Sequence, residues 1–179
     1  MRVVSISGAS GAGKTTLQEK LIECCDYARV LSHTTRPRRI TDREGEYHYS
    51  SVSDFFRLKD SLWSVEIHGN HYSTQRSDLC KAAAQGNGAV IVMSVDCLLH
   101  LNKFCFAQDI QHIAIHLLSP SKMILRERMI SRGDDCGDVD RRVHECSAWD
   151  DLARTMKFIR LVPPMSQLET FDHVMTIIG

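Results

Sequence analysis

The sequence predicts an α/β fold built on a parallel sheet, and three observations predict it. Short apolar stretches alternate with segments of helical period along almost the whole chain. Residues 89–95 form a continuous apolar run, which is typical of a strand covered on both faces. A glycine-rich loop separates the first apolar stretch from the first helical one.

The strands are predicted from runs of apolar and β-branched residues. A strand is expected to begin at residues 30–32, whereas residues 33–51 lack helical period and indicate loop and short strands. The turn signal at residues 68–71 separates two further strands. The predicted strands besides that at 30–32 are residues 2–7, 63–67, 72–74, 89–95, 113–118 and 158–162.

The helices are predicted from their periodicity and their end signals. Leu17 and Leu21 lie four residues apart, so a helix is expected from Lys14 to about residue 25. Ser53 is the predicted N-cap of a short helix over residues 54–59. The other predicted helices are residues 75–85, 97–104, 121–131, 139–155 and 168–178.

Length and composition indicate a globular protein with balanced charge. The chain has 179 residues, of which 43% are hydrophobic and 25% charged, and these values exclude a disordered or fibrous protein. Lys plus Arg total 22 and Asp plus Glu total 22, which removes the simplest argument for a nucleic-acid partner. No apolar run approaches the ~20 residues that a membrane span needs. We therefore expect neither nucleic acid nor membrane as a partner.

The cysteines predict a reducing environment. There are seven, without a C-x-x-C pair and without a preceding secretory leader. We expect reduced, mostly buried thiols in a cytoplasmic protein. Zinc is the alternative, and the absence of paired ligand spacing among the cysteines and nine histidines argues against it.

A phosphate-binding loop is predicted at residues 8–15, Gly-Ala-Ser-Gly-Ala-Gly-Lys-Thr, which match G-x-x-x-x-G-K-[ST]. Glycines let backbone N–H groups approach phosphate oxygens, and the following helix adds positive potential at its N-terminus. Lys14 would contact the outer phosphates, and the Thr15 hydroxyl would reach Mg²⁺. A ligand-free glycine turn is the alternative, but the flanking strand and helix argue against it.

An arginine-rich segment follows at residues 32–39, Ser-His-Thr-Thr-Arg-Pro-Arg-Arg. Arginine forks match phosphate oxygens bidentately, so this segment suits a second anion. A solvated basic loop would be the default interpretation without the phosphate loop upstream.

These blocks and those that follow resemble the guanylate kinase family of nucleoside monophosphate kinases over nearly the whole chain. Residues 32–39 match its S-x-T-T-R-x-x-R motif, and Gly45 and Tyr47 match its G-x-x-Y with one residue fewer between them. Residues 69–74 match its G-N-x-Y-x-[ST], and Asp96 matches the acid after the central strand. Arg128, Arg132 and Arg142 match the arginines of its lid.

The resemblance implies a three-layer P-loop kinase fold with a parallel sheet core, a monophosphate-binding insertion and a lid. The core would comprise residues 1–31, 80–124 and 144–179, the acceptor-binding region residues 32–79, and the lid residues 125–143. The implied activity is phosphorylation of a (deoxy)nucleoside monophosphate by ATP with Mg²⁺, with GMP or dGMP the first candidate acceptor. A homo-oligomer is compatible with this interpretation.

The resemblance also implies roles for single residues. The catalytic residues would be Lys14, Arg128, Arg132 and Arg142. Arg128 and Arg132 are four residues apart, so both are expected to point from one helical face into the same cleft. The acceptor phosphate would be held by Ser32, Arg36, Arg39, Tyr47 and Tyr72, and the guanine edge by Thr74 and Asp96. The ATP phosphates would be held by Gly8, Ser10, Gly11, Ala12, Gly13, Lys14, Thr15 and Thr16, with Thr15 also on the metal.

Departures from the family pattern concern base recognition. Trp63 occupies the position of a glutamate that reads guanine, and Glu66, three residues later, would point to the opposite face of a strand. Ser94 replaces an acid that helps to organise Mg²⁺, and residues 161–165 lack the usual Asn-Asp-Asp near the donor base. Asp42 in place of a glutamate is a milder change.

Three alternatives stay open at this point. They are a kinase for a modified or non-guanine nucleotide, a catalytically weak guanylate-kinase-like binding module, and a kinase for a phosphosugar. The intact Lys14 and Thr15 argue against a binding module, because such modules tend to lose the phosphate loop.

Overall fold

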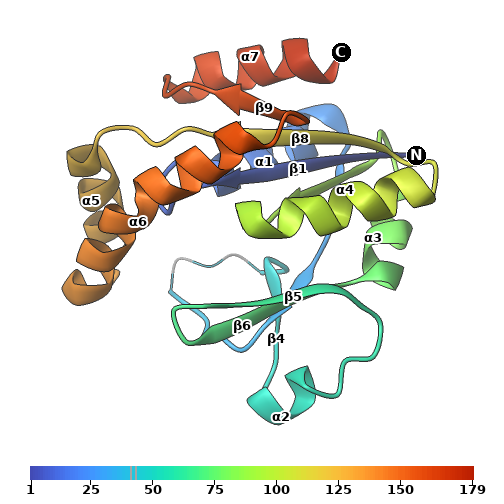
Figure 1. The fold of residues 1–179 in the computed structure, drawn as a ribbon, viewed down its shortest axis with the longest axis horizontal. Coiled ribbons are helices and arrows are strands. Elements are labelled where there is room, and N and C mark those ends of the chain that lie inside the picture. The colour runs from blue at the N-terminus through green and yellow to red at the C-terminus, as the bar shows by residue number, and fades with distance from the viewer. Residues whose placement is uncertain (41, 43) are drawn as a thin grey trace.

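The computed structural model describes residues 1–40, 42 and 44–179. It contains two sheets, a larger one in the core and a smaller one set beside it (Figure 1). The predicted α/β fold is confirmed. The predicted acceptor-binding region 32–79 includes residues 41 and 43, which lie outside the described residues.

The core sheet has five parallel strands in the order β2-β7-β1-β8-β9. Their bounds are β1 Arg2–Gly8, β2 Ala28–Arg29, β7 Ala89–Val92, β8 Gln111–Leu117 and β9 Ile159–Val162. Because all strands run the same way, their carboxyl ends share one edge, where ligands of such sheets bind.

Helices cover both faces of this sheet, so the core has three layers. Val3 and Ile91 pack with α3 (Arg76–Ala83), α4 (Leu98–Ala107) and α6 (Cys136–Thr155) on one face. Val4 and Val90 pack with α1 (Lys14–Cys25) and α7 (Gln167–Ile178) on the other. Successive strand residues point to opposite faces, which explains why neighbours such as Val3 and Val4 join different clusters. Figure 1 shows α4 and α7 on opposite sides of the sheet.

The smaller sheet has the order β4-β3-β6-β5. Its strands are β3 (Ser32–Thr34), β4 (Tyr47–Tyr49), β5 (Ser61–Ile67) and β6 (Asn70–Gln75), with β3 parallel to β4 and antiparallel to β6. The strand expected to begin at residues 30–32 begins at Ser32 as β3 in the smaller sheet, whereas β2 of the core sheet ends at Arg29, and residues 30–31 cross between the two sheets. This crossing carries the chain from one sheet to the other.

Two helix starts differ from the prediction by two residues or more. Ser51, not Ser53, caps α2 by accepting from the Asp54 N–H, and α2 covers only Val52–Phe55. Asp135 caps α6 by accepting from the backbone N–H groups of Gly137 and Asp138, so α6 begins earlier than residue 139. The reason is the same in both cases: an earlier Ser or Asp satisfies the free N–H groups of the first turn.

Two further elements complete the chain. The predicted strand 89–95 ends at Val92, and a 3₁₀ turn over Val95–Cys97 leads into α4. Helix α5 spans Lys122–Ser131 and packs against α6. Figure 1 shows α5 and the beginning of α6 projecting beyond the core sheet.

The cysteines of the structure are free, as predicted, but fewer are buried than expected. Cys97, Cys105 and Cys146 are buried, whereas Cys24 and Cys136 are exposed. Among the described residues, none of the helices is both long and apolar enough to cross a membrane.

Candidate active site

A cavity of about 370 Å³ lies at the carboxyl ends of β1 and β7, between the core and the smaller sheet. Its lining is divided by chemistry. One part, the cationic wall, consists of Lys14, Arg36, Arg39, Arg132 and Arg142. A second part, the apolar wall, consists of Trp63, Val65, Met93, Val95 and Trp149, which belong to one hydrophobic cluster. The lining also includes three acids, Asp42, Glu46 and Glu145. The cavity therefore suits a ligand with an anionic end and a flat, weakly polar end.

The phosphate loop lines the cavity and contributes Lys14 to the cationic wall. Gly8 has φ 141°, and a Cβ there would lie 2.6 Å from the Leu117 carbonyl oxygen. Gly13 has φ 101° and begins α1. Both positions require glycine, the first for close approach to β8 and the second for its backbone conformation.

Within the loop, the predicted phosphate-binding residues are placed as follows. Gly8, Ser10, Lys14 and Thr15 line the cavity. Gly11, Ala12 and Gly13 complete the turn between β1 and α1, and Thr16 is exposed on the first turn of the helix. Lys14 Nζ donates to the carbonyl oxygens of Gly8 at 2.9 Å and Ala9 at 2.8 Å.

Arg36 is positioned by a carboxylate and two tyrosine rings. Its Nη1 lies 2.9 Å from Asp42 Oδ2, and its guanidinium carbon lies 5.5 Å from the Tyr47 ring centroid and 5.9 Å from that of Tyr49. Asp42 also accepts from the Arg39 backbone N–H and the Tyr49 hydroxyl, each at 2.7 Å. Arg36 is thus held in place by side chains of the protein itself.

A buried carboxylate that the sequence analysis missed joins the acceptor segment to the lid. Asp134 lies 3.5 Å from Arg39 Nε, accepts from Arg132 Nε at 2.9 Å and from Arg142 Nη1 at 3.2 Å. Its side chain is only 4% exposed. Burial would raise its pKa, but the hydrogen bond from Arg132 and the charges of Arg132, Arg39 and Arg142 hold it below the usual range.

The two lid arginines that are four residues apart do not share one cleft. Arg132, at the C-terminal end of α5, lines the cavity with Arg142. Arg128 is outside the described lining and donates to the Gly11 carbonyl oxygen at 2.8 Å. The helix ends between them, so the spacing argument fails: Arg132 already follows a non-helical path.

The predicted base-reading residues are not together in the cavity. Thr74 is fully buried, and its hydroxyl is 2.8 Å from that of Ser32. Asp96 is exposed in the 3₁₀ turn and lies outside the described cavity lining. In contrast, all the predicted acceptor-phosphate residues line the cavity; they are Ser32, Arg36, Arg39, Tyr47 and Tyr72.

Three buried polar atoms lack a hydrogen-bond partner within the described part of the chain, and all belong to residues of the cavity lining. They are Trp63 Nε1, Ser94 Oγ and Arg142 Nε. Trp63 is 6% exposed. Buried polar groups of this kind are costly unless a partner satisfies them, so these atoms favour a polar ligand in the cavity.

The charge state of Lys14 depends on what the cavity holds. Burial, and then the charges of Arg132 and Arg142, lower its pKa to about 7. Phosphate oxygens beside Nζ would favour the charged form and raise the pKa again.

When a polyphosphate binds above about pH 7, Lys14 is therefore expected to take up a proton. At about pH 8 the free lysine is mostly neutral and the bound lysine charged, so affinity should fall as the pH rises above about 7. Calorimetry of ATP binding at about pH 8, in buffers of different ionisation enthalpy, measures the uptake. The Lys14→Met variant should lose it, and undiminished uptake in that variant would contradict the assignment.

The fold and the loop together define a P-loop phosphate-binding protein of the α/β class. The family model described as guanylate kinase matches residues 1–151, and the chain belongs to that family. This result confirms the resemblance seen in the sequence.

Individual relatives agree with the family. The chain is 36% identical over 139 residues to a guanylate kinase of Rhizobium etli, a match covering 75% of this chain and 62% of the relative. It is 35% identical to one of Paraburkholderia xenovorans, with 60% of that protein covered. The chain thus spans about three fifths of these two relatives. A Chelativorans guanylate kinase is 30% identical, with 91% of this chain and 82% of the relative covered.

A solved structure shares the fold. The crystal structure of guanylate kinase from Anaplasma phagocytophilum matches with a TM-score of 0.71 at 20% identity. The match covers 99% of this chain and 84% of that one.

Proposed function

We propose that the chain is an ATP-dependent nucleoside monophosphate kinase with GMP or dGMP as its first acceptor. The observation that carries the proposal is the convergence of the phosphate-loop lysine and four arginines on one cavity. Phosphoryl transfer between two nucleotides requires mainly positioning and neutralisation of phosphate charge, which such a cavity supplies. The guanylate kinases to which the chain is similar support the choice of acceptor.

The acceptor phosphate is assigned to the smaller sheet and its loops. Arg36 offers a guanidinium already oriented by Asp42, and Tyr47 on β4 and Tyr72 on β6 add hydroxyls from two strands that flank β3 in the same sheet. Burial, the largest cause, raises the pKa of Tyr47 above its ordinary value, which keeps its hydroxyl protonated and able to donate. We assign residues 32–79 to acceptor binding on this basis.

The transferring phosphoryl group is assigned to Lys14, Arg132 and Arg142. Arg132 and Arg142 both donate to Asp134, so phosphate oxygens must compete with this carboxylate for the two arginines. Arg128 steadies the phosphate loop through Gly11 and reaches the ligand only if that contact opens. We assign residues 125–143 to the lid, and residues 1–31, 80–124 and 144–179 to the core.

The donor set at the loop fits a magnesium ion held mainly by the ATP phosphates. The Thr15 hydroxyl lines the cavity, and Ser94 supplies a second buried hydroxyl oxygen without a partner among the described residues. Oxygen donors suit Mg²⁺, which keeps several waters and needs few protein ligands. When bound, the ion would neutralise the charge that develops on the phosphate oxygens.

The apolar wall implies weak discrimination between bases. Trp63 presents an N–H donor where guanine, itself a donor at N1 and N2, would need an acceptor. We therefore expect GMP to be used with a smaller preference over other monophosphates than a carboxylate at this position would give.

Assay of ADP release across the common (d)NMPs tests the proposal. Turnover with GMP or dGMP is expected. Lack of turnover with every monophosphate would overturn the kinase assignment, and turnover with pyrimidine nucleotides alone would overturn the guanine assignment. No observation favours a binding module or a phosphosugar kinase. Cytoplasmic location, a homo-oligomer and the lack of a nucleic-acid partner stay predictions.

A further inference from the structure

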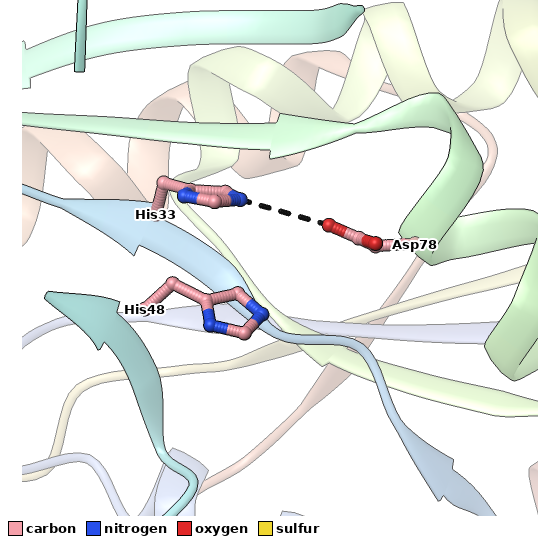
Figure 2. A group of neighbouring side chains, drawn as sticks. All are labelled: His33, His48 and Asp78. Carbon is pink, nitrogen blue, oxygen red and sulfur yellow. Dashed lines mark ion pairs between the residues drawn. The ribbon is translucent and has the colours of Figure 1, made fainter. Parts of the chain in front are cut away.

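A second cluster of metal-ligating side chains lies outside the cavity. It consists of His33 on β3, His48 on β4 and Asp78 in the first turn of α3. One ligand atom of each residue lies within 4.8 Å of those of the other two. Figure 2 shows the His33 ring directed at Asp78, with the His48 ring beside it. None of the three has a role in the proposed reaction.

The smaller sheet brings these residues together. His33 and His48 are partners in the parallel register of β3 and β4, so their side chains share one face of the sheet. Their ring centroids are 4.7 Å apart. Strand β6 pairs with β3 on its other side and leads directly into α3, which carries Asp78. Three separate elements therefore converge on one point.

The spacing suits a tetrahedral ion. Two ligand atoms each about 2.0–2.1 Å from the same zinc lie about 3.4 Å apart. His33 Nε2 and Asp78 Oδ2 are 3.6 Å apart, so little movement is needed to bring an ion between them. This separation is too long for a good hydrogen bond, and the direct pair accordingly contributes little by itself.

We propose that His33, His48 and Asp78 form a zinc site with water in the fourth position. Two imidazoles and one carboxylate are a common zinc donor set, with an open position left for water. His48 is exposed, and the His33 and Asp78 side chains are 17% and 27% exposed, which gives the ion a path from solvent.

His33 is half-buried beside a second imidazole and a carboxylate. Burial and the neighbouring His48 lower the pKa of His33, although Asp78 acts in the opposite direction. Neutral imidazole is the form that binds metal.

The site would stabilise the smaller sheet from the face opposite the cavity. Ser32 and Tyr47 line the cavity, and each precedes a histidine of the cluster by one residue. Because side chains alternate along a strand, the cluster lies on the face opposite the acceptor phosphate. Zinc would hold β3, β4 and α3 together without entering the reaction.

Zinc titration of the metal-free full chain, in competition with a chromophoric zinc indicator, tests the proposal. Tight binding by the wild type is expected, with at least about tenfold weaker binding by His48→Gln and by Asp78→Asn, since even the loss of an outer-shell partner costs that much. His100→Gln removes an exposed histidine of α4 and is the matched control that should bind as the wild type does. At the same zinc concentration, zinc should raise the melting temperature of the wild type and the control by more than that of the two site variants.

Binding of zinc by cysteine thiols is the competing explanation, because free thiols are exposed at Cys24 and Cys136. The spectrum of the Co²⁺-loaded protein separates the two, since thiolate ligands add an intense near-ultraviolet charge-transfer band. We expect no such band. The proposal is overturned if the band appears, if both site variants bind zinc as tightly as the wild type, or if the wild type binds no zinc.

Discussion

Replacement of Lys14 by Met is expected to lower the turnover of the acceptor by at least about 100-fold. Lys14 lines the same cavity as Arg132 and Arg142, and the charges of these two arginines contribute to lowering its pKa. Loss of one preorganised donor to a developing anionic charge typically costs about 100- to 1,000-fold in turnover, and Lys14 also carries charge. Methionine keeps most of the apolar length of the side chain, so the change removes the ammonium with little loss of packing.

The fold of this variant should survive. A lysine whose pKa is lowered to about 7 is held in an unfavourable place for its charge, so removal of that charge relieves repulsion from two arginines. Lys81→Met, at an exposed position of α3, is the matched control and should turn over as the wild type does. Steady-state kinetics measures the turnover, and thermal melting shows whether the variant is folded. If a folded Lys14→Met protein retained its turnover, the phosphate loop would have no part in the mechanism.

Sequence was sufficient to predict the parts of the site that are local in the chain. The loop at residues 8–15 is a single turn between a strand and a helix, so its geometry follows from its own glycines. The acceptor arginines and Tyr47 were predicted through the family motif, and the structure places them around the same cavity. The three layers of the core were predictable because continuous apolar runs indicate strands covered on both faces. Successive residues of these strands do pack into clusters on opposite faces of the sheet.

Sequence was not sufficient where a role depends on distant partners. Asp134 is one acid in an acidic loop, and only the fold shows that it joins Arg39 to Arg132 and Arg142. The cluster at His33, His48 and Asp78 was missed because its members are far apart in sequence, and metal motifs are recognised by short spacing. Helical spacing placed Arg128 beside Arg132, but α5 ends between them.

Trp63→Glu is expected to raise selectivity for GMP over the other monophosphates by roughly 5- to 150-fold. Trp63 lines the apolar wall, and in the family pattern its position holds the glutamate that reads guanine. A carboxylate there would accept from the N–H groups of the guanine edge, a pairing worth about 1–3 kcal/mol between bases. The change also replaces a donor that has no partner among the described residues by an acceptor at the same strand position.

The measured quantity is the ratio of kcat/KM for GMP to that for AMP, CMP and UMP. This ratio is independent of the folded fraction, which matters because loss of a buried tryptophan costs about 3–5 kcal/mol of stability. Trp63→Gln separates removal of the indole from addition of the charge. Ser64→Glu is the matched control, because it adds the same carboxylate at the adjacent, exposed position of β5, facing away from Trp63. An unchanged ratio in folded Trp63→Glu protein would show that this wall does not contact the base.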